Sequence, residues 1–199
     1  MLNGTFDGGG RLQHVDADVD GKPGADWVAG AIDEIASTNC ATLLNRTQAF
    51  GFYDHGMVYL LQSLTDHLPL ADRSGPRERL WKVRAKQVII ATGAFERPMV
   101  FPNNDRPGVM LAEAGLTYAA RYAAAPGRSI LMATNNSSAY TAAAELAKLN
   151  VSIGCLIDAR DDPPPEDLEL ARRSGIDVRS GRTVINVDGV GGVRSARIA

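Results

Sequence analysis

The sequence has few of the residues that build metal centres and disulfide scaffolds. Its 199 residues include two cysteines and three histidines. Cys40 and Cys155 are far apart and form no Cys-x-x-Cys arrangement, so we expect two reduced structural thiols. His14, His55 and His67 lie near neither one another nor a cysteine, which argues against a metal site.

An excess of charge of one sign and a long apolar run are also missing. The 21 basic and 23 acidic residues leave a net charge of −2, and no basic face that would bind nucleic acid emerges. No apolar run is long enough to span a bilayer, and Met1 is followed by polar, glycine-rich sequence without a signal-peptide core. We therefore expect a cytoplasmic globular protein that binds neither nucleic acid nor membrane.

The clearest positive feature is the apolar run Lys86-Gln-Val-Ile-Ile-Ala91, which breaks into Thr92-Gly93-Ala94. Residues 88–91 are too few for a helix, are rich in β-branched side chains and do not alternate with polar residues, which predicts a parallel strand covered on both faces. Gly93 then ends the strand in a turn where a ligand can approach backbone N–H groups, and Arg97 could contact an anionic cofactor. A tight turn without a ligand is an equally weighted alternative, because short glycine motifs are weak evidence.

The rest of the first half predicts one helix and several strands. We interpret residues 1–24 as a loop, followed by an amphipathic helix from Trp27 to Ser37 with Asp26 as its cap. We expect a short strand at residues 42–45 and a later helix at 109–124. Between them we expect a three-stranded antiparallel meander, with Gly56 in its first turn and strands at 48–52, 57–64 and 79–83.

The second half predicts a βαβ unit with a right-handed crossover, formed by residues 129–133, 139–149 and 151–157. A helix at 166–173 and strands at 177–179 and 183–187 follow. The fold class is therefore α/β. Between the two halves, the Pro/Gly-rich loop 103–108 could hold two domains together or contact a phosphate through Arg106.

A dinucleotide fingerprint should lie in the turn of the βαβ unit. Its three glycine positions are occupied by Thr134, Asn136 and Ala139, so the two glycines that admit a pyrophosphate are lost. Asp158 nevertheless ends the second strand where an acid would bind a ribose, and residues 135–138 could donate to a phosphate. Two interpretations stay open: a nucleotide site, or a structural copy in which Ser137 or Ser138 caps the helix.

Three motifs together resemble the alpha subunit of heterotetrameric sarcosine oxidase. They are Ala91-Thr-Gly-Ala-Phe-Glu-Arg-Pro98, Phe101-Pro-Asn-Asn-Asp-Arg-Pro-Gly-Val-Met110 and Ala133-Thr-Asn-Asn-Ser-Ser-Ala-Tyr140. The segments 48–54 and 21–27 are similar as well, so the resemblance covers nearly the whole chain. One departure is Phe95, where the family commonly has histidine.

The resemblance implies a partial two-dinucleotide-domain, Rossmann-like architecture of the glutathione-reductase type. Residues 1–111 would be the back half of the first domain, and 112–199 a second, degenerate one. The family carries a Gly-x-Gly-x-x-Gly strand before this region and a folate-binding domain after it, and we expect the chain to be an internal piece of such a subunit. The resemblance implies NAD as cofactor, bound by Ala91, Thr92, Gly93, Ala94 and Arg97.

The family oxidises sarcosine to glycine, a one-carbon unit and hydrogen peroxide, with beta, gamma and delta subunits as partners and flavins on the beta subunit and at the alpha–beta interface. No residue here is a credible catalyst, so we expect an inactive isolated chain that binds NAD weakly or not at all and self-associates through exposed sheet edges. The alternatives are a subunit of an opine or dye-linked amino-acid dehydrogenase, and a non-enzymatic scaffold with dead nucleotide sites.

Overall fold

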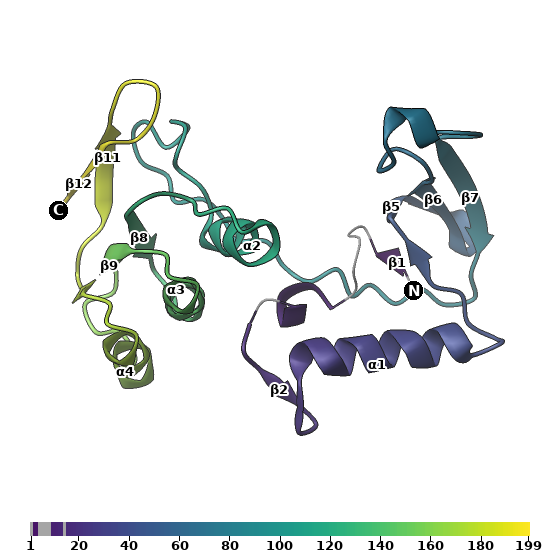
Figure 1. Cartoon of the computed structure of the whole chain (residues 1–199), viewed down its shortest axis with the longest axis horizontal. Coiled ribbons are helices and arrows are strands. Elements are labelled where there is room, and N and C mark those ends of the chain that lie inside the picture. Colours follow the sequence, from purple (N-terminus) through teal and green to yellow (C-terminus); the bar gives the residue numbers. More distant parts are fainter. Residues whose placement is uncertain (1, 4–8, 14) are drawn as a thin grey trace. The chain divides into compact units, whose positions relative to one another are not determined.

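The computed structural model describes residues 2–3, 9–13 and 15–199, which form two compact units, Met1–Gly93 and Ala94–Ala199 (Figure 1). His14 and part of the loop predicted at residues 1–24 lie outside the described residues. The domain limits predicted from the sequence, 1–111 and 112–199, stay a prediction. By its contacts the linker 94–111 belongs with the second unit.

The first unit begins with short elements around one long helix. A helix of 14 residues, α1 (Gly24–Ser37), buries Val28 and half-buries Ile32 and Ile35, as the apolar spacing predicted. Its N-cap residue is Pro23, so the prediction that Asp26 caps the helix was wrong. Because Pro23 ends the preceding extended segment, the helix begins at Gly24 and Asp26 lies in its first turn, where its charge still favours the helix dipole.

The remaining short strands of the first unit form two pairs. The part of the chain predicted as loop contains a 3-10 turn and an antiparallel strand pair, at Gly10–Gln13 and in β2 (Asp18–Val19) and β3 (Lys22–Pro23). A parallel pair joins β1 (Leu2–Asn3) to β4 (Leu44–Asn45).

A three-stranded antiparallel meander confirms the predicted hairpin and its third strand. It consists of β5 (Thr47–Tyr53), β6 (Met57–Ser63) and β7 (Glu78–Arg84). Gly56 closes the first turn with a φ of +69°, and a Cβ there would lie 2.2 Å from the carbonyl oxygen of Ala85. The turn therefore requires glycine, both for its conformation and for its space.

The strand predicted at residues 86–91 is not formed, and this prediction was wrong. Val88, Ile89 and Ile90 are 43%, 91% and 81% exposed. A buried parallel strand needs a hydrogen-bonded neighbour on each side, and within the described part of the chain no strand pairs with this run. The apolar residues that predicted burial are therefore displayed to solvent.

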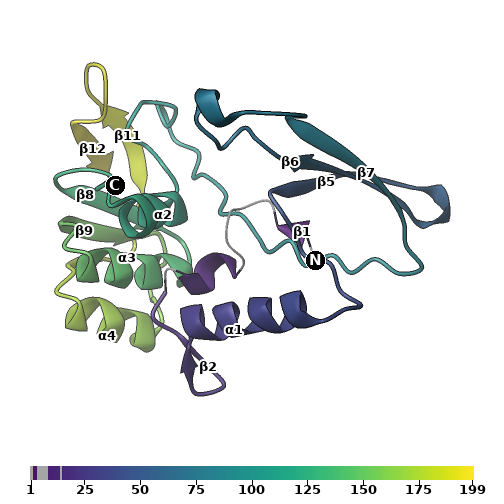
Figure 2. The ribbon, with the colours of Figure 1, turned by 45° about the vertical axis from the view of Figure 1, so that its right-hand side comes forward.

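The second unit contains the predicted βαβ unit and extends it. A parallel sheet of order β10-β9-β8 is covered by helices, with α2 packed on α3 and α3 on α4 (Figure 2). The elements are α2 (Ala112–Tyr122), β8 (Ile130–Thr134), α3 (Ser138–Lys148), β9 (Ile153–Asp158), α4 (Pro165–Arg173) and β10 (Val178–Arg179). An antiparallel pair, β11 (Val184–Asp188) and β12 (Ser195–Ile198), follows.

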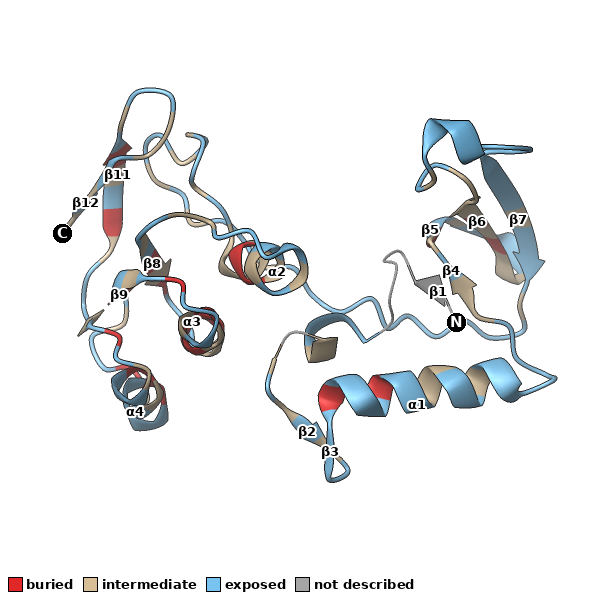
Figure 3. Ribbon diagram, in the orientation of Figure 1, coloured by how far each residue is buried: buried red, intermediate tan, exposed pale blue. Residues whose placement is uncertain are grey.

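Most fully buried side chains lie in this second unit (Figure 3). Leu146 of α3 is 1% exposed, and Leu156 and Ile157 of β9 are 0% exposed. Burial of a side chain of this size stabilises a fold by about 1.5–3 kcal/mol. The core between α3 and β9 therefore fixes the ends of both elements, where the turn residues lie.

The loop 103–108 packs against the turn between β11 and β12. Asn103 Nδ2 donates to Asn186 Oδ1 over 2.8 Å, the half-buried Arg106 donates to the carbonyl of Gly189, and the Val193 N–H donates to the Pro107 carbonyl over 2.9 Å. Arg106 thus holds the linker to this turn.

Across the described residues, the helices include none that combines the length and the apolarity needed to cross a membrane.

Candidate functional site

The segment 91–97, predicted to bind a cofactor, has an open and irregular backbone. Ala91, Thr92 and Gly93 end the first unit and are exposed, and Ala94 and Arg97 are exposed in the second. Gly93 has a φ of +73°, and no heavy atom lies within 4 Å of the position that a Cβ would take. The strand that this glycine was predicted to end is absent, and the positive φ and open space beside its backbone leave room for a ligand. Whether these residues bind NAD stays a prediction.

Glu96 anchors the same segment, although sequence reasoning missed it. The half-buried Glu96 carboxylate accepts a hydrogen bond from the backbone N–H of Glu113, 2.9 Å away, in the first turn of α2. The N-cap residue of α2 is Leu111, which has no side-chain acceptor, so Glu96 supplies the missing one together with a favourable negative charge. An apolar N-cap residue is the signal that could have prompted a search for an acceptor elsewhere.

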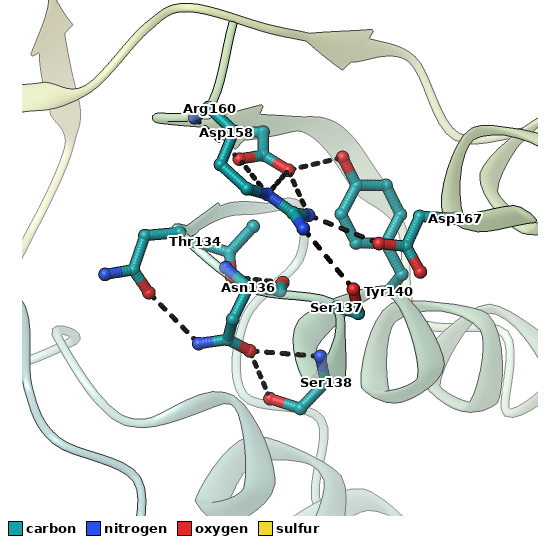
Figure 4. A network of polar contacts seen from close by, with 9 residues as sticks. Thr134, Asn136, Ser137, Ser138, Tyr140, Asp158, Arg160 and Asp167 are labelled. Atoms are coloured by element: carbon teal, nitrogen blue, oxygen red, sulfur yellow. Dashed lines mark hydrogen bonds and ion pairs between the residues drawn. The ribbon is translucent and has the colours of Figure 1, made fainter. Parts of the chain in front are cut away.

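The turn after β8 closes on itself through side chains. Thr134 Oγ1 donates to the Asn136 carbonyl over 2.9 Å and accepts from the Asn136 N–H over 3.1 Å. Asn136 Oδ1 accepts from both the backbone N–H and the hydroxyl of Ser138, over 3.0 and 2.6 Å (Figure 4). The polar turn was predicted from the sequence, but the hydrogen bonds of Thr134 and Asn136 within it were not.

The acceptor at the start of α3 is therefore Asn136, and neither serine performs this role as predicted. Ser137 occupies the N-cap position but makes no side-chain capping bond. Its backbone is already helical, with φ −75° and ψ −21°, whereas a capping side chain usually stands on an extended residue.

A buried ionic network lies at the end of β9, on the other side of this turn (Figure 4). Asp158 is 0% exposed, and its Oδ2 accepts from Tyr140 Oη and from Arg160 Nη2, each 2.7 Å away. Its Oδ1 accepts from the backbone N–H of Arg160 over 2.9 Å. Arg160 Nη2 also reaches Asp167 Oδ2 on α4, 3.2 Å away, and so links β9 to that helix.

The network shifts the pKa values of Asp158, Tyr140 and Arg160 further away from neutral pH. Burial raises the pKa of Asp158, but the hydrogen bonds from Arg160 and Tyr140 outweigh it and hold this pKa below the usual value for aspartate. Burial and the hydrogen bond to Asp158 raise the pKa of Tyr140, while the hydrogen bond to Asp158 raises the pKa of Arg160. Tyr140 is thus a neutral donor between a carboxylate and a guanidinium.

Sequence reasoning singled out Asp158 as lying where an acid would bind a ribose, which stays a prediction, and it missed the partners Arg160, Tyr140 and Asp167. The Asp-x-Arg spacing at the end of a buried strand is the available signal. Among residues 2–3, 9–13 and 15–199 there is no group of three His, Cys, Asp or Glu side chains that could hold a metal. Cys40 is exposed and Cys155 buried, and both are free.

No family model matches the sequence, but individual relatives do. A sarcosine oxidase subunit alpha of Corynebacterium sp. (strain P-1) is 38% identical over 190 residues, which are 94% of this chain and 19% of the relative. A sarcosine oxidase subunit alpha of Rhizobium meliloti (strain 1021) is 41% identical over 152 residues, 76% of this chain and 15% of the relative. The chain thus spans about one fifth of the length of these proteins.

Solved oxidoreductases share the fold at low sequence identity. The L-proline dehydrogenase of P. horikoshii matches with a TM-score of 0.61 and 21% identity over 98% of this chain and 32% of its own. The thioredoxin reductase of T. acidophilum matches with a TM-score of 0.63 and 12% identity, over 99% of this chain and 60% of its own. The chain therefore shares the Rossmann-like α/β fold of these solved oxidoreductases, as predicted from the sequence.

Proposed function

We propose that the chain is an NAD-binding segment of an amine oxidoreductase of the sarcosine oxidase kind, because it is homologous to about one fifth of the alpha subunits of those enzymes. The observation that carries the proposal is the identity of 38–41% over 76–94% of the chain. Sequence similarity of this extent reflects common descent. The Rossmann-like fold supports a dinucleotide in general, and NAD is the specific part of the proposal.

The proposed NAD-binding residues are Ala91, Thr92, Gly93, Ala94 and Arg97. Gly93 supports this assignment because its positive φ and the free space beside it leave room for a phosphate to approach the backbone. Arg97 is exposed and contributes a positive charge toward the pyrophosphate. Glu96 keeps this stretch attached to α2 through its bond to Glu113.

The whole enzyme's chemistry is part of the same proposal. We assign it the oxidation of sarcosine to glycine, a one-carbon unit and hydrogen peroxide, with flavins on the beta subunit and at the alpha–beta interface and with gamma and delta subunits as further partners. This chain's share is binding and assembly, and alone it is inactive. The exposed apolar run at Val88, Ile89 and Ile90 supports association with other polypeptide. A cytoplasmic location stays a prediction.

An NMR titration of the 15N-labelled chain with millimolar NAD tests the site, because it detects the weak binding that we expect. Gly93→Val should abolish the shifts seen in the wild-type chain. Gly75→Val is the matched control, since Gly75 also has a positive φ, of +78°, and no heavy atom within 4 Å of the place that a Cβ would take. Arg97→Gln, compared with the exposed Arg128→Gln, should weaken binding severalfold.

Two outcomes would contradict the proposal. Either the wild-type chain shows no shift with NAD at any concentration, or Gly75→Val reduces binding as much as Gly93→Val does. Testing which secondary amine the intact complex oxidises would separate a sarcosine oxidase from an opine or other amino-acid dehydrogenase.

A further inference from the structure

The second unit has the shape of a dinucleotide-binding βαβ unit, yet its own side chains occupy both positions that a dinucleotide would use. In such folds the pyrophosphate binds the N–H groups at the start of the helix, and an acid at the end of the second strand binds the ribose hydroxyls. Here these positions are the start of α3 and the carboxylate of Asp158. The N–H at the start of α3 already has an acceptor within the chain, and the carboxylate of Asp158 already has donors within the chain.

At the phosphate position, an amide oxygen replaces the anion. The Ser138 N–H, which begins α3, donates to Asn136 Oδ1 over 3.0 Å, and the Ser138 hydroxyl donates to the same atom over 2.6 Å. The Asn136 N–H is bound by Thr134 Oγ1. A phosphate would have to displace Asn136 before it could reach these donors.

At the ribose position, the acid is already saturated. Asp158 accepts from four donors, which are the Tyr140 hydroxyl and the backbone N–H, the Nε–H (shared between both carboxylate oxygens) and the Nη2–H of Arg160, and a carboxylate offers about four lone-pair sites. Arg160 also bonds to Asp167 and approaches the Ser137 hydroxyl, so its guanidinium is held from several sides. A ribose would have to break a charge pair whose carboxylate is fully buried.

We infer that the second unit is a self-liganded dinucleotide fold, in which Asn136 takes the place of the phosphate and Arg160 that of the ribose. NAD taken up by this chain consequently binds at residues 91–97 and not at the turn 134–138. The location at 91–97 rests on the proposed function. The internal occupancy of the turn does not, because it follows from the hydrogen bonds of the second unit alone.

Residue-resolved NMR of the 15N-labelled chain with millimolar NAD tests the inference. In the wild-type chain the amides of residues 134–140 and 158–160 should not shift. Asn136→Ala removes an exposed side chain and frees the Ser138 N–H, so NAD should now shift Ser138 and its neighbours. Asn45→Ala, at an exposed asparagine of the first unit, should behave as the wild type does.

A second variant tests the ribose half. Arg160→Gln should make residues 158–160 respond to NAD, whereas Arg179→Gln, in the exposed Asp177-x-Arg179 pair of the same spacing, should not. Dispersed amide spectra without NAD establish that each variant is folded. If Arg160→Gln unfolds, Asn136→Ala decides the question.

The outcomes separate the two proposals. Shifts at residues 134–140 or 158–160 in the wild-type chain overturn the internal occupancy, as does a folded Asn136→Ala chain that stays unresponsive. If the wild-type chain responds nowhere, the proposed function fails, while a gain of response in Asn136→Ala still supports the occupied turn.

Discussion

Two apolar runs of similar composition have opposite fates in this molecule. Residues 86–91 and the strand β9 (Ile153–Asp158) are both short, apolar and contain β-branched side chains. In β9, Leu156 and Ile157 are fully buried, and β8 and β10 pair with the strand on either side. In the other run, Ile89 is 91% exposed. An apolar run therefore shows that a segment can be buried, and its neighbours decide whether it is.

The segments that follow two apolar runs, residues 92–94 and 134–136, differ in whether their backbone is open or occupied. Both include threonine, at Thr92 and Thr134, but glycine follows Thr92, and two asparagines follow Thr134. No heavy atom outside its chain neighbours lies within 4 Å of the position that a Cβ of Gly93 would take, whereas the side-chain oxygen of Asn136 accepts from the Ser138 N–H at the start of α3. The backbone at Gly93 is therefore open, and that at the start of α3 is occupied.

The largest expected effect tests the difference between the two runs directly. Leu156→Ala should lower the free energy of unfolding by about 2–5 kcal/mol, because it leaves a cavity in a packed core. Ile89→Ala removes an exposed side chain and should change it by less than about 0.5 kcal/mol. Urea denaturation measures both. A comparable loss in Ile89→Ala would mean that the run 86–91 is buried in solution.

The buried network of the second unit should show in the dependence of stability on pH. Asp158→Asn weakens charge-assisted hydrogen bonds and should cost about 1.5–3 kcal/mol at pH 7. The folded state lowers the pKa of Asp158, so its stabilisation is complete above the ordinary aspartate pKa of 3.8 and is lost as the pH falls through the folded value.

The urea midpoints of the wild type and Asp158→Asn should therefore differ at pH 7 and converge at a pH below the folded pKa of Asp158. The control is Asp177→Asn, whose partner Arg179 lies 3.4 Å away in an exposed pair. It should change stability by less than about 1 kcal/mol. If the cost of Asp158→Asn is the same at both pH values, the charge of Asp158 does not contribute as described.

A smaller effect is expected at Glu96, which attaches the predicted cofactor segment to α2. Glu96→Gln keeps a hydrogen-bond acceptor for the Glu113 N–H but removes the charge at the helix N-terminus. The expected loss is about 0.3–1 kcal/mol, and it should decrease at high salt. Urea denaturation at low and high salt measures it, and an equal loss in both would exclude the electrostatic explanation.

The smallest expected effect is that one tyrosine, Tyr140, does not ionise at alkaline pH. The chain has five tyrosines, and Tyr140 is 0% exposed with its hydroxyl donating to Asp158. Burial first, and then this bond, raise its pKa, so it should stay protonated above the ordinary tyrosine pKa of 10.0. Absorbance at alkaline pH counts the ionised tyrosines. Five ionising together in the folded chain would contradict the buried contact.

Much of the fold could be predicted because its signals are local. The strand runs on either side of the turn at Gly56 predicted the meander, and the spacing of Val28, Ile32 and Ile35 predicted α1. The hydrogen-bond partners of Asp158 were harder to predict from the sequence. Arg160 is two residues from Asp158, but Tyr140 and Asp167 come from two helices that only the packed unit brings to it.

By itself, the sequence determined the meander and the βαβ unit, because hydrophobic period and turn chemistry act over a few neighbouring residues. The tertiary structure alone decided that residues 86–91 stay unpaired and that Asp158 is occupied by Arg160 and Tyr140. Strand pairing and buried ion pairs depend on partners distant in the chain, and a local pattern does not contain those partners.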